Sequence, residues 1–262
     1  MSAEITSINY CPVKSISFQS LENCKIKKNI GIIGDRIFAF AKDLDIEQAK
    51  LFEESPAERK GKWNKVLTLK NSPALNKYNF IFKDEKLTLT LKDKEIFSIN
   101  INQSSERKAL SNKISELESS FKQPITLIKN DNFPFFDTSI SKKIDFVNSV
   151  SLLNIQSIND FEKKVNKKIE TSIFRGNICI DGLEPWKEME WIGKNIKINN
   201  VLFKVEKNIP RCVAINLKPQ TDDNSFNLLQ LLKKTYNHFD MGVFLTALND
   251  GVISTGDLIN FD

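Results

Sequence analysis

The feature that most constrains the fold is a series of short segments that alternate apolar and polar residues. The run Lys86-Leu-Thr-Leu-Thr-Leu-Lys92 alternates at every position, which places one face of a strand in a core and the other in water. Strands are expected at residues 5–10, 21–26, 37–41, 66–70, 78–82, 87–91, 96–99, 178–181, 196–198, 201–206, 243–245 and 251–257. Many short strands separated by turns are typical of a β-barrel or a β-sandwich.

Three segments change to the period of an α-helix. Leu110, Ile114, Leu117 and Phe121 follow one another at spacings of four, three and four residues, so they share one helical face, and Pro124 is expected to end this helix. Ser104 or Ser105 can cap this helix at its start. Further helices are expected over residues 155–169 and 226–236. The predicted fold class is α+β and mainly β, with one domain over residues 1–122 and a second over residues 123–262.

Charge and hydropathy exclude several classes of partner. The chain of 262 residues has 38 basic and 33 acidic residues, and the lysines are interleaved with apolar residues rather than gathered into one basic stretch. We therefore expect no nucleic-acid partner. The first ten residues lack the basic and apolar regions of a signal peptide, and no apolar run approaches the ~20 residues that span a bilayer. These observations predict a cytoplasmic protein that is not bound to a membrane.

Several motifs with known chemistry are missing. The chain contains no G-x-G-x-x-G, no G-x-x-x-x-G-K-[ST], no H-E-x-x-H and no G-x-S-x-G, which argues against Rossmann, P-loop, zincin and esterase proteins. Its single histidine, His238, excludes a site with several histidine ligands. The four cysteines form no C-x-x-C pair, so neither a zinc knuckle nor an iron-sulfur cluster is predicted, and we expect free thiols.

One cysteine is placed where it could bind a metal. Cys212 directly follows Arg211, whose positive charge favours the thiolate form that a metal requires. A thiolate is a suitable ligand for a soft metal. The alternative is that Cys212 is a small, buried apolar residue, which is the more common role of a lone cysteine in a β-rich protein.

Two short turns carry groups that could hold an anion. Lys14 and Ser15 come directly after the first strand and offer an ammonium and a hydroxyl to a phosphate or a polar ring. Arg36 begins another strand and can contact a phosphate through two nitrogens. The alternatives are an ordinary loop for the first turn and, for the second, a surface pair between Arg36 and Asp35 that contributes less than about 1 kcal/mol.

Taken in order, these residues and several others resemble the MOSC family, named for the C-terminal domain of molybdenum cofactor sulfurase. The resemblance runs through nearly the whole chain, and its similarity is greatest to the amidoxime-reducing component proteins and their bacterial relatives. The matching elements are Tyr10-Cys-Pro-Val-Lys14-Ser15, Gly34-Asp35-Arg36, Phe136-Asp137, Ser149-Val-Ser151-Leu152, Phe174-Arg175-Gly176-Asn177, Trp186-Lys-Glu188-Met-Glu-Trp191, Arg211-Cys212 with Pro219 and Thr221, and Gly242 with residues 251–257.

The resemblance implies a fold and a set of cofactor ligands. The fold would be an N-terminal β-barrel half packed against a C-terminal MOSC β-barrel domain with peripheral helices. Cys212 would bind the metal of a molybdenum pterin cofactor (Mo-molybdopterin) and serve as the catalytic residue. The cofactor-binding residues implied by the resemblance are Lys14, Ser15, Arg36, Asp137, Ser149, Ser151, Arg175, Asn177 and Arg211.

The resemblance also implies an activity. Proteins of this kind reduce N-hydroxylated compounds, such as amidoximes and N-hydroxylated bases, by oxygen-atom transfer at molybdenum. The electrons would come from a separate flavin reductase, ferredoxin-like protein or haem protein. A second hypothesis is a carrier protein that holds the molybdenum cofactor or sulfur without catalysing a reaction.

Overall fold

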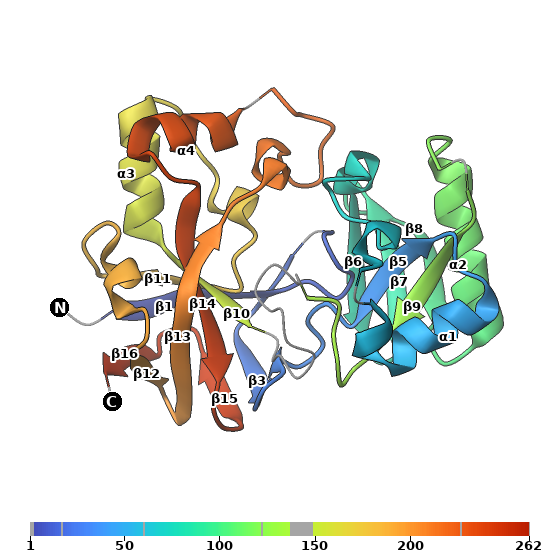
Figure 1. Ribbon diagram of the computed structural model, residues 1–262, viewed down its shortest axis with the longest axis horizontal. Helices are drawn as coiled ribbons and strands as arrows, with labels where there is room; N and C mark the ends of the chain where they lie inside the picture. Colours follow the sequence, from blue (N-terminus) through green and yellow to red (C-terminus); the bar gives the residue numbers. More distant parts are fainter. Residues whose placement is uncertain are drawn as a thin grey trace.

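A closed ring of seven β-strands forms one half of the molecule (Figure 1). The computed structural model describes residues 3–16, 18–59, 61–121, 123–136, 149–225 and 227–261. The strands of the ring are, in order, β11 (Ile178–Asp181), β10 (Val150–Asn154), β14 (Asp240–Ala247), β13 (Val201–Pro210), β12 (Asn195–Ile198), β16 (Leu258–Phe261) and β1 (Ala3–Tyr10). The ring closes because β1 pairs antiparallel with β11. A short strand, β2 (Gln19–Leu21), extends β1 on its outer edge.

The barrel is held together by the apolar residues that alternate along its strands. Ile5 and Ile8 of β1 are fully buried, and they join Ile180, Val205 and Leu245 from three other strands in one core. Each fully buried side chain of this size stabilises the fold by about 1.5–3 kcal/mol relative to an exposed one. The alternation in the sequence therefore sets which face of each strand points into the barrel.

Gly242 allows two strands of the barrel to approach closely. It has a φ of 78°, and a Cβ atom at this position would lie 2.3 Å from the carbonyl oxygen of Leu152 in β10. Only glycine combines this backbone conformation with the space available. The close contact brings β14 against β10 at the end of the barrel that carries Ser151 and Phe244.

Two helices cover one end of the barrel. They are α3 (Ile155–Val165) and α4 (Leu228–Tyr236), which lie side by side in Figure 1. Asn154 caps α3 by accepting a hydrogen bond from the backbone N–H of Gln156. Phe161 and Leu232 are fully buried between the helices and the barrel.

The other half of the molecule consists of two small sheets packed face to face. One sheet contains β5 (Phe38–Lys42) and β9 (Ile125–Lys129), and the other contains β6 (Tyr78–Lys83), β7 (Lys86–Leu91) and β8 (Lys94–Asn100). The rings of Phe40 and Phe80 lie 5.8 Å apart between them. The helices α1 (Ile46–Glu54) and α2 (Ser104–Leu117) pack against β9.

A third sheet, of β15 (Gly251–Ser254), β3 (Asn23–Lys27) and β4 (Gly31–Ile32), joins segments from both ends of the chain.

The mainly β fold with a barrel and peripheral helices is confirmed, whereas a closed barrel in the first half is not seen in the described ranges. The first strand of the chain, β1, belongs to the barrel of the other half, because its pairing with β11 closes that ring. Residues 66–70 were expected to form a strand, but only Val66 makes an isolated bridge, to Ala41. No helix among the described residues has both the length and the apolar character needed to cross a membrane.

Among the described residues, four strand pairings cross residue 122. They join β1 to β11, β1 to β16, β3 to β15 and β5 to β9. The domain limits 1–122 and 123–262 stay a prediction, and these pairings argue for a boundary in space rather than at one point in the sequence.

Candidate functional site

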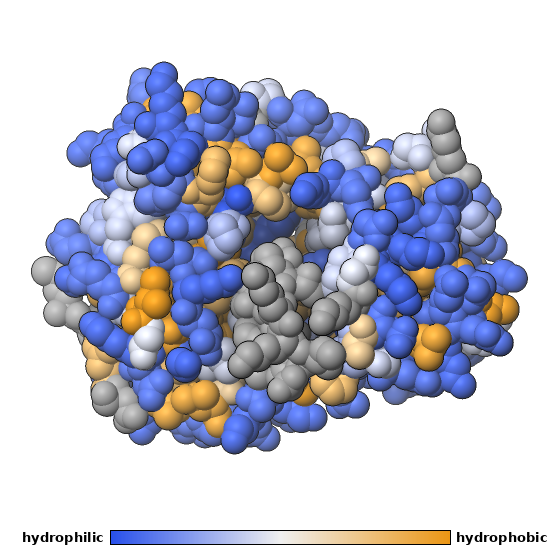
Figure 2. All heavy atoms as spheres, in the orientation of Figure 1, coloured by the Kyte–Doolittle hydropathy of each residue, from blue (hydrophilic) through white to orange (hydrophobic). Residues whose placement is uncertain are grey.

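A pocket gathers most of the residues predicted from the sequence motifs. It encloses about 780 Å³ of space, its open mouth included. Figure 2 shows the surface hollowed between the two halves of the molecule. Seven predicted residues line this pocket, namely Lys14, Ser15, Arg36, Ser151, Arg175, Arg211 and Cys212. They come from separate segments of the chain, so the fold and not the sequence brings them together.

Two neighbouring loops place the first three of these residues. The backbone N–H of Arg36 donates to the carbonyl oxygen of Cys11 over 2.6 Å, and that of Lys14 donates to Phe38 over 2.8 Å. Ser15 has a φ of 66° and Arg36 a φ of 54°, so both loops turn sharply through the left-handed region. The loop after β1 and the loop before β5 therefore lie side by side, with Lys14, Ser15 and Arg36 facing one pocket.

Arg36 and Asp35 form a buried ion pair, and the alternative of a surface pair is wrong. Their side chains are only 12% and 9% exposed. Asp35 also accepts a hydrogen bond from the backbone N–H of Cys11 over 2.7 Å. Burial raises the pKa of Asp35, while the positive charge of Arg36 acts in the opposite direction.

Part of the Arg36 guanidinium remains available to the pocket. Its Nη1 contacts Asp35 and lies 3.4 Å from Oδ1 of Asn177. Its carbon Cζ lies over the rings of Phe18 and Phe136, at 5.3 Å and 4.8 Å. Within the described ranges, Nε and Nη2 of Arg36 have no hydrogen-bond partner in the protein. A ligand in the pocket could accept hydrogen bonds from these two nitrogens.

Arg175 lies at the back of the pocket with one buried nitrogen unpaired. It follows the 3-10 helix η5 (Thr171–Phe174) and adopts a left-handed conformation, with φ 49°. Its Nη1 donates to the carbonyl oxygens of Ile173 and Ala214, and its Nη2 donates to Oδ1 of Asn76 over 2.7 Å. Its Nε is buried and has no partner in the part of the chain that the structure describes. Burial lowers the pKa of Arg175 to about 10, and the nearby thiol groups of Cys11 and Cys212 act in the opposite direction.

Cys212 presents an exposed thiol to this pocket, so the alternative of a small, buried apolar residue is wrong. It directly precedes the 3-10 helix η7 (Val213–Asn216). Cys11, Cys24 and Cys179 are buried, and all four cysteines are free thiols as expected. Burial raises the pKa of Cys11 and Cys24 to about 12.

Arg211 fixes the backbone beside Cys212. Its Nη1 donates to the carbonyl oxygen of Phe174 over 2.7 Å, and its Nε donates to Met241 over 2.9 Å. Its Nη2 also contacts the oxygen of Met241. Burial lowers the pKa of Arg211 to about 9, and the charge of Cys212 opposes this shift. The side chain therefore anchors the cysteine segment to its neighbours, with all three nitrogens bonded to backbone.

Two further predicted residues, Ser149 and Asn177, are not among those that line the pocket. Asn177 is fully buried, and its Oδ1 accepts hydrogen bonds from the backbone N–H and the hydroxyl of Ser151, at 3.1 Å and 2.7 Å. It therefore holds Ser151 in place. Ser149 is buried one residue before β10, and its hydroxyl has no partner in the described ranges. Asp137 lies outside the described residues.

The sequence motifs included two residues of the aromatic wall of the pocket, Phe136 and Phe174, but they did not reveal Phe18, Phe244 or Asn76. Phe136 and Phe244 face each other with ring centroids 5.9 Å apart, and both line the pocket together with Phe18 and Phe174. Apolar residues such as Phe18 and Phe244 are expected in any core, so nothing in the sequence marked these two. Asn76 stands in a segment that resembles no motif.

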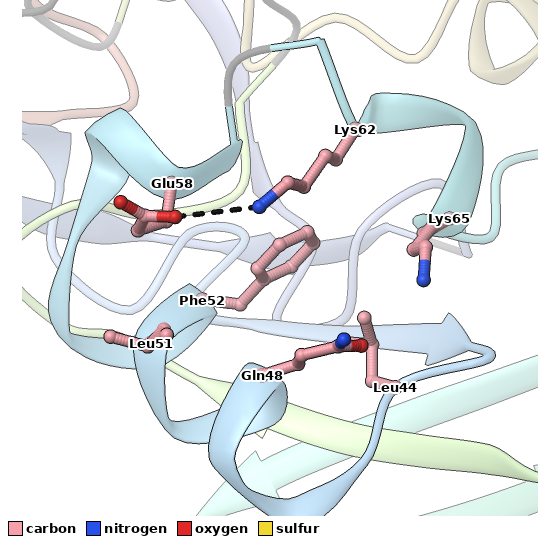
Figure 3. A pocket seen from close by; sticks show the side chains of 7 residues that line it. All are labelled: Leu44, Gln48, Leu51, Phe52, Glu58, Lys62 and Lys65. Atoms are coloured by element: carbon pink, nitrogen blue, oxygen red, sulfur yellow. Dashed lines mark hydrogen bonds and ion pairs between the residues drawn. The ribbon is translucent and has the colours of Figure 1, made fainter.

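A second pocket, shown in Figure 3, lies beside α1 and is mainly apolar. Leu44, Leu51 and Phe52 form its apolar surface, and Lys62 pairs with Glu58 over 3.4 Å at its edge. None of the seven residues that line this pocket was singled out by the motifs. Among the described residues, no three His, Cys, Asp or Glu side chains gather to form a metal site.

Comparisons with known proteins point to one family. The model of the MOSC domain matches residues 144–260. Mitochondrial amidoxime reducing component 2 of Bos taurus is 28% identical over 92 residues, which make up 35% of this chain and 27% of that protein. The matched segment thus spans about a quarter of the length of the bovine protein.

Two solved structures are similar at low sequence identity. YuaD protein from Bacillus subtilis is 11% identical, with a TM-score of 0.44 over 99% of this chain and 94% of that chain. YiiM from Geobacillus stearothermophilus is 16% identical, with a TM-score of 0.35 over 43% of this chain and 53% of that chain. The family match covers the barrel strands from β10 to β16 and the segment that carries Arg211 and Cys212. The family to which residues 144–260 of this chain are similar is thus the MOSC domain family.

Proposed function

We propose that this chain binds a molybdenum pterin cofactor through Cys212 and reduces N-hydroxylated substrates, such as amidoximes and N-hydroxylated bases. One observation carries the proposal. Seven residues chosen from sequence motifs in both halves of the chain line a single pocket around an exposed thiol. The name of the bovine relative, an amidoxime reducing component, supports the substrate class over the segment that matches.

The donors in the pocket fit such a cofactor. The phosphate of a pterin cofactor carries negative charge, and Lys14, Arg36 and Arg175 bring three cationic side chains to one place. Arg175 has a buried Nε that lacks a partner in the described ranges, which a bound anion could satisfy. Cys212 supplies a thiolate, a ligand suited to a soft metal. The residues that stay predicted as further cofactor-binding residues are Ser15, Asp137, Ser149, Ser151, Asn177 and Arg211.

Each residue then has a defined task. When bound, the molybdenum centre would supply the two-electron oxygen-atom transfer. Arg211 fixes the backbone on the N-terminal side of Cys212, so that the sulfur points into the pocket in one orientation. Asn177 holds Ser151 and contacts Arg36, which orients both toward the ligand. Phe136 and Phe244 form an apolar wall that limits the access of water.

The overall reaction needs an external source of electrons. An amidoxime, two electrons and two protons yield an amidine and one water molecule. We propose that the electrons come from a separate flavin reductase, ferredoxin-like protein or haem protein. A cytoplasmic location and the absence of a nucleic-acid partner stay predictions.

The second candidate is a carrier that holds the cofactor or sulfur without turnover. The exposed thiol of Cys212 favours it as much as it favours the reductase. A turnover assay separates the two functions. Cofactor-loaded protein is mixed with an amidoxime and reduced methyl viologen, and the amidine formed is measured by chromatography. Multiple amidines formed per molybdenum support the reductase, whereas bound molybdenum without turnover supports the carrier.

A further inference from the structure

Asn76 connects the first half of the molecule to the segment that follows Cys212. It lies in the 3-10 helix η3 (Pro73–Lys77), directly before β6, and only 4% of its surface is exposed. Its Nδ2 donates to the carbonyl oxygens of Lys218 and Thr221, over 2.6 Å and 2.8 Å. Its own carbonyl oxygen accepts from the backbone N–H of Gln220 over 2.9 Å. The segment 218–221 is therefore tied to a residue more than 140 positions earlier in the chain.

The same side chain also orients the arginine at the back of the pocket. Oδ1 of Asn76 accepts a hydrogen bond from Nη2 of Arg175 over 2.7 Å. Arg175 in turn donates from Nη1 to the carbonyl oxygen of Ala214 over 3.0 Å, and Ala214 lies in η7, two residues after Cys212. Asn76 thus acts on η7 by two routes, through Arg175 and through the segment that follows η7.

The side-chain amide of Asn76 holds both Arg175 and the segment 218–221 in place. Both polar atoms of the side chain, Oδ1 and Nδ2, are bonded to residues of the second half. If Nη2 of Arg175 lost this partner, the guanidinium would be held through Nη1 alone, and its unpaired Nε would be fixed less firmly.

We propose that Asn76 is a positioning residue for the cofactor site, through which the first half of the molecule fixes Arg175 and the turn after Cys212. The inference rests on the proposed function, because it assigns Asn76 a part in holding the cofactor. The role proposed for Asn76 differs from a general contribution to the stability of the fold. A residue that only joins the two halves would affect unfolding, whereas a positioning residue also affects the thiol and the metal.

Two variants and a matched control test this role. Asn76→Ala removes every side-chain hydrogen bond, and Asn76→Asp keeps an oxygen for Arg175 but loses the donor to Lys218 and Thr221. The control is Asn154→Ala. Asn154 is 1% exposed, and its Nδ2 donates to Glu184 and Glu188 away from the pocket, so its loss removes a similar buried amide.

The first measurement uses the metal-free protein. Cys212 is the exposed thiol and the other three cysteines are buried, so the rate of alkylation by iodoacetamide, followed by mass spectrometry, reports on Cys212. We expect Asn76→Ala to be alkylated faster than the wild type, with Asn76→Asp between them and Asn154→Ala unchanged. Equal rates in Asn76→Ala and the wild type would overturn the inference.

The second measurement uses protein loaded with cofactor. We expect Asn76→Ala to retain about tenfold less molybdenum after dialysis than the wild type, and the Mo(V) electron paramagnetic resonance signal to change in shape. Asn154→Ala should match the wild type in both readouts even where its melting temperature falls equally. Equal losses in Asn76→Ala and Asn154→Ala would show a purely structural role. Should Asn76→Ala not fold, Asn76→Asp decides by the same criteria.

The two hypotheses can fail separately. A wild-type protein that binds no molybdenum would contradict the proposed function, while the alkylation rates would still decide whether Asn76 controls the turn that carries Cys212. A wild-type protein that binds molybdenum, together with an unaffected Asn76→Ala variant, would contradict only the role of Asn76.

Discussion

Arg175 donates a hydrogen bond from Nη1 to the carbonyl oxygen of Ala214 over 3.0 Å, so an arginine at the back of the pocket holds the turn that follows Cys212. This contact couples the two parts of the proposed cofactor site. Through this hydrogen bond, movement of the Arg175 guanidinium, which would bind an anion, is coupled to movement of the backbone that carries the Cys212 thiol. A change at Arg175 should therefore affect both.

Replacing Arg175 by lysine should release the cofactor. Arg175→Lys keeps the positive charge but cannot contact Asn76, Ile173 and Ala214 at the same time. We expect about tenfold less molybdenum per chain, measured by inductively coupled plasma mass spectrometry. Arg107→Lys is the control, because Arg107 also has a buried, unpaired Nε in the described ranges but pairs with Glu53 in the first half. Equal molybdenum in the two variants would argue against the role of Arg175.

Replacing Arg36 by glutamine should make stability depend on pH. Arg36→Gln leaves the Asp35 carboxylate buried without its positive partner, which lowers the free energy of unfolding by about 3 kcal/mol near neutral pH. Burial already raises the folded-state pKa of Asp35, and loss of Arg36 raises it further.

The sign of this pH dependence follows from where the proton binds. A folded state with a raised carboxyl pKa binds more protons than the unfolded state, so its stability falls as pH rises above the ordinary value of 3.8. The deficit of Arg36→Gln relative to the wild type should be smallest in acid and grow toward pH 7. Urea unfolding of both proteins between pH 4 and 7 measures this difference. A deficit that is constant over this range would contradict the account of the buried pair.

Replacing Gly242 by alanine should disrupt the contact between β14 and β10. The new Cβ would lie 2.3 Å from the carbonyl oxygen of Leu152, in addition to the cost of a φ of 78°. We expect the free energy of unfolding to fall by about 3 kcal/mol. Gly193→Ala separates the two effects, because Gly193 has a φ of 82° with no atom within 4 Å of the position of a Cβ. It should lose only about 1 kcal/mol, and equal losses in chemical denaturation would rule out the steric contribution.

Strands and turns could be predicted from the sequence where a short run of neighbouring residues determines them. Residues 178–181 were expected to form a strand and correspond to β11, because a short apolar run stands between Asn177 and Gly182. The strands expected at residues 196–198 and 201–206 correspond to β12 and β13, and the turn between them contains Asn199 with a positive φ of 51°.

Long-range features could not be predicted in this way. The pairing of β1 with β11 closes the barrel, but the apolar pattern of a strand does not specify its partner. The helix α1 was missed because it buries only Phe52 and leaves Ile46 90% exposed, which gives no clear helical stripe. The same limit applies to the site. Cys212 and Arg211 stand in a recognisable motif, whereas Asn76 contacts backbone carbonyls far along the chain, which no motif encodes.

The molybdenum content of the wild type and of Cys212→Ala tests the central claim most directly. Both proteins would be produced in a host that makes the cofactor, purified in parallel and analysed for molybdenum per chain. Cys212 is exposed, so its replacement by alanine should leave the melting temperature of the metal-free protein nearly unchanged. The account predicts bound molybdenum in the wild type and very little in Cys212→Ala. Equal molybdenum in the two proteins, or none in the wild type, would contradict it.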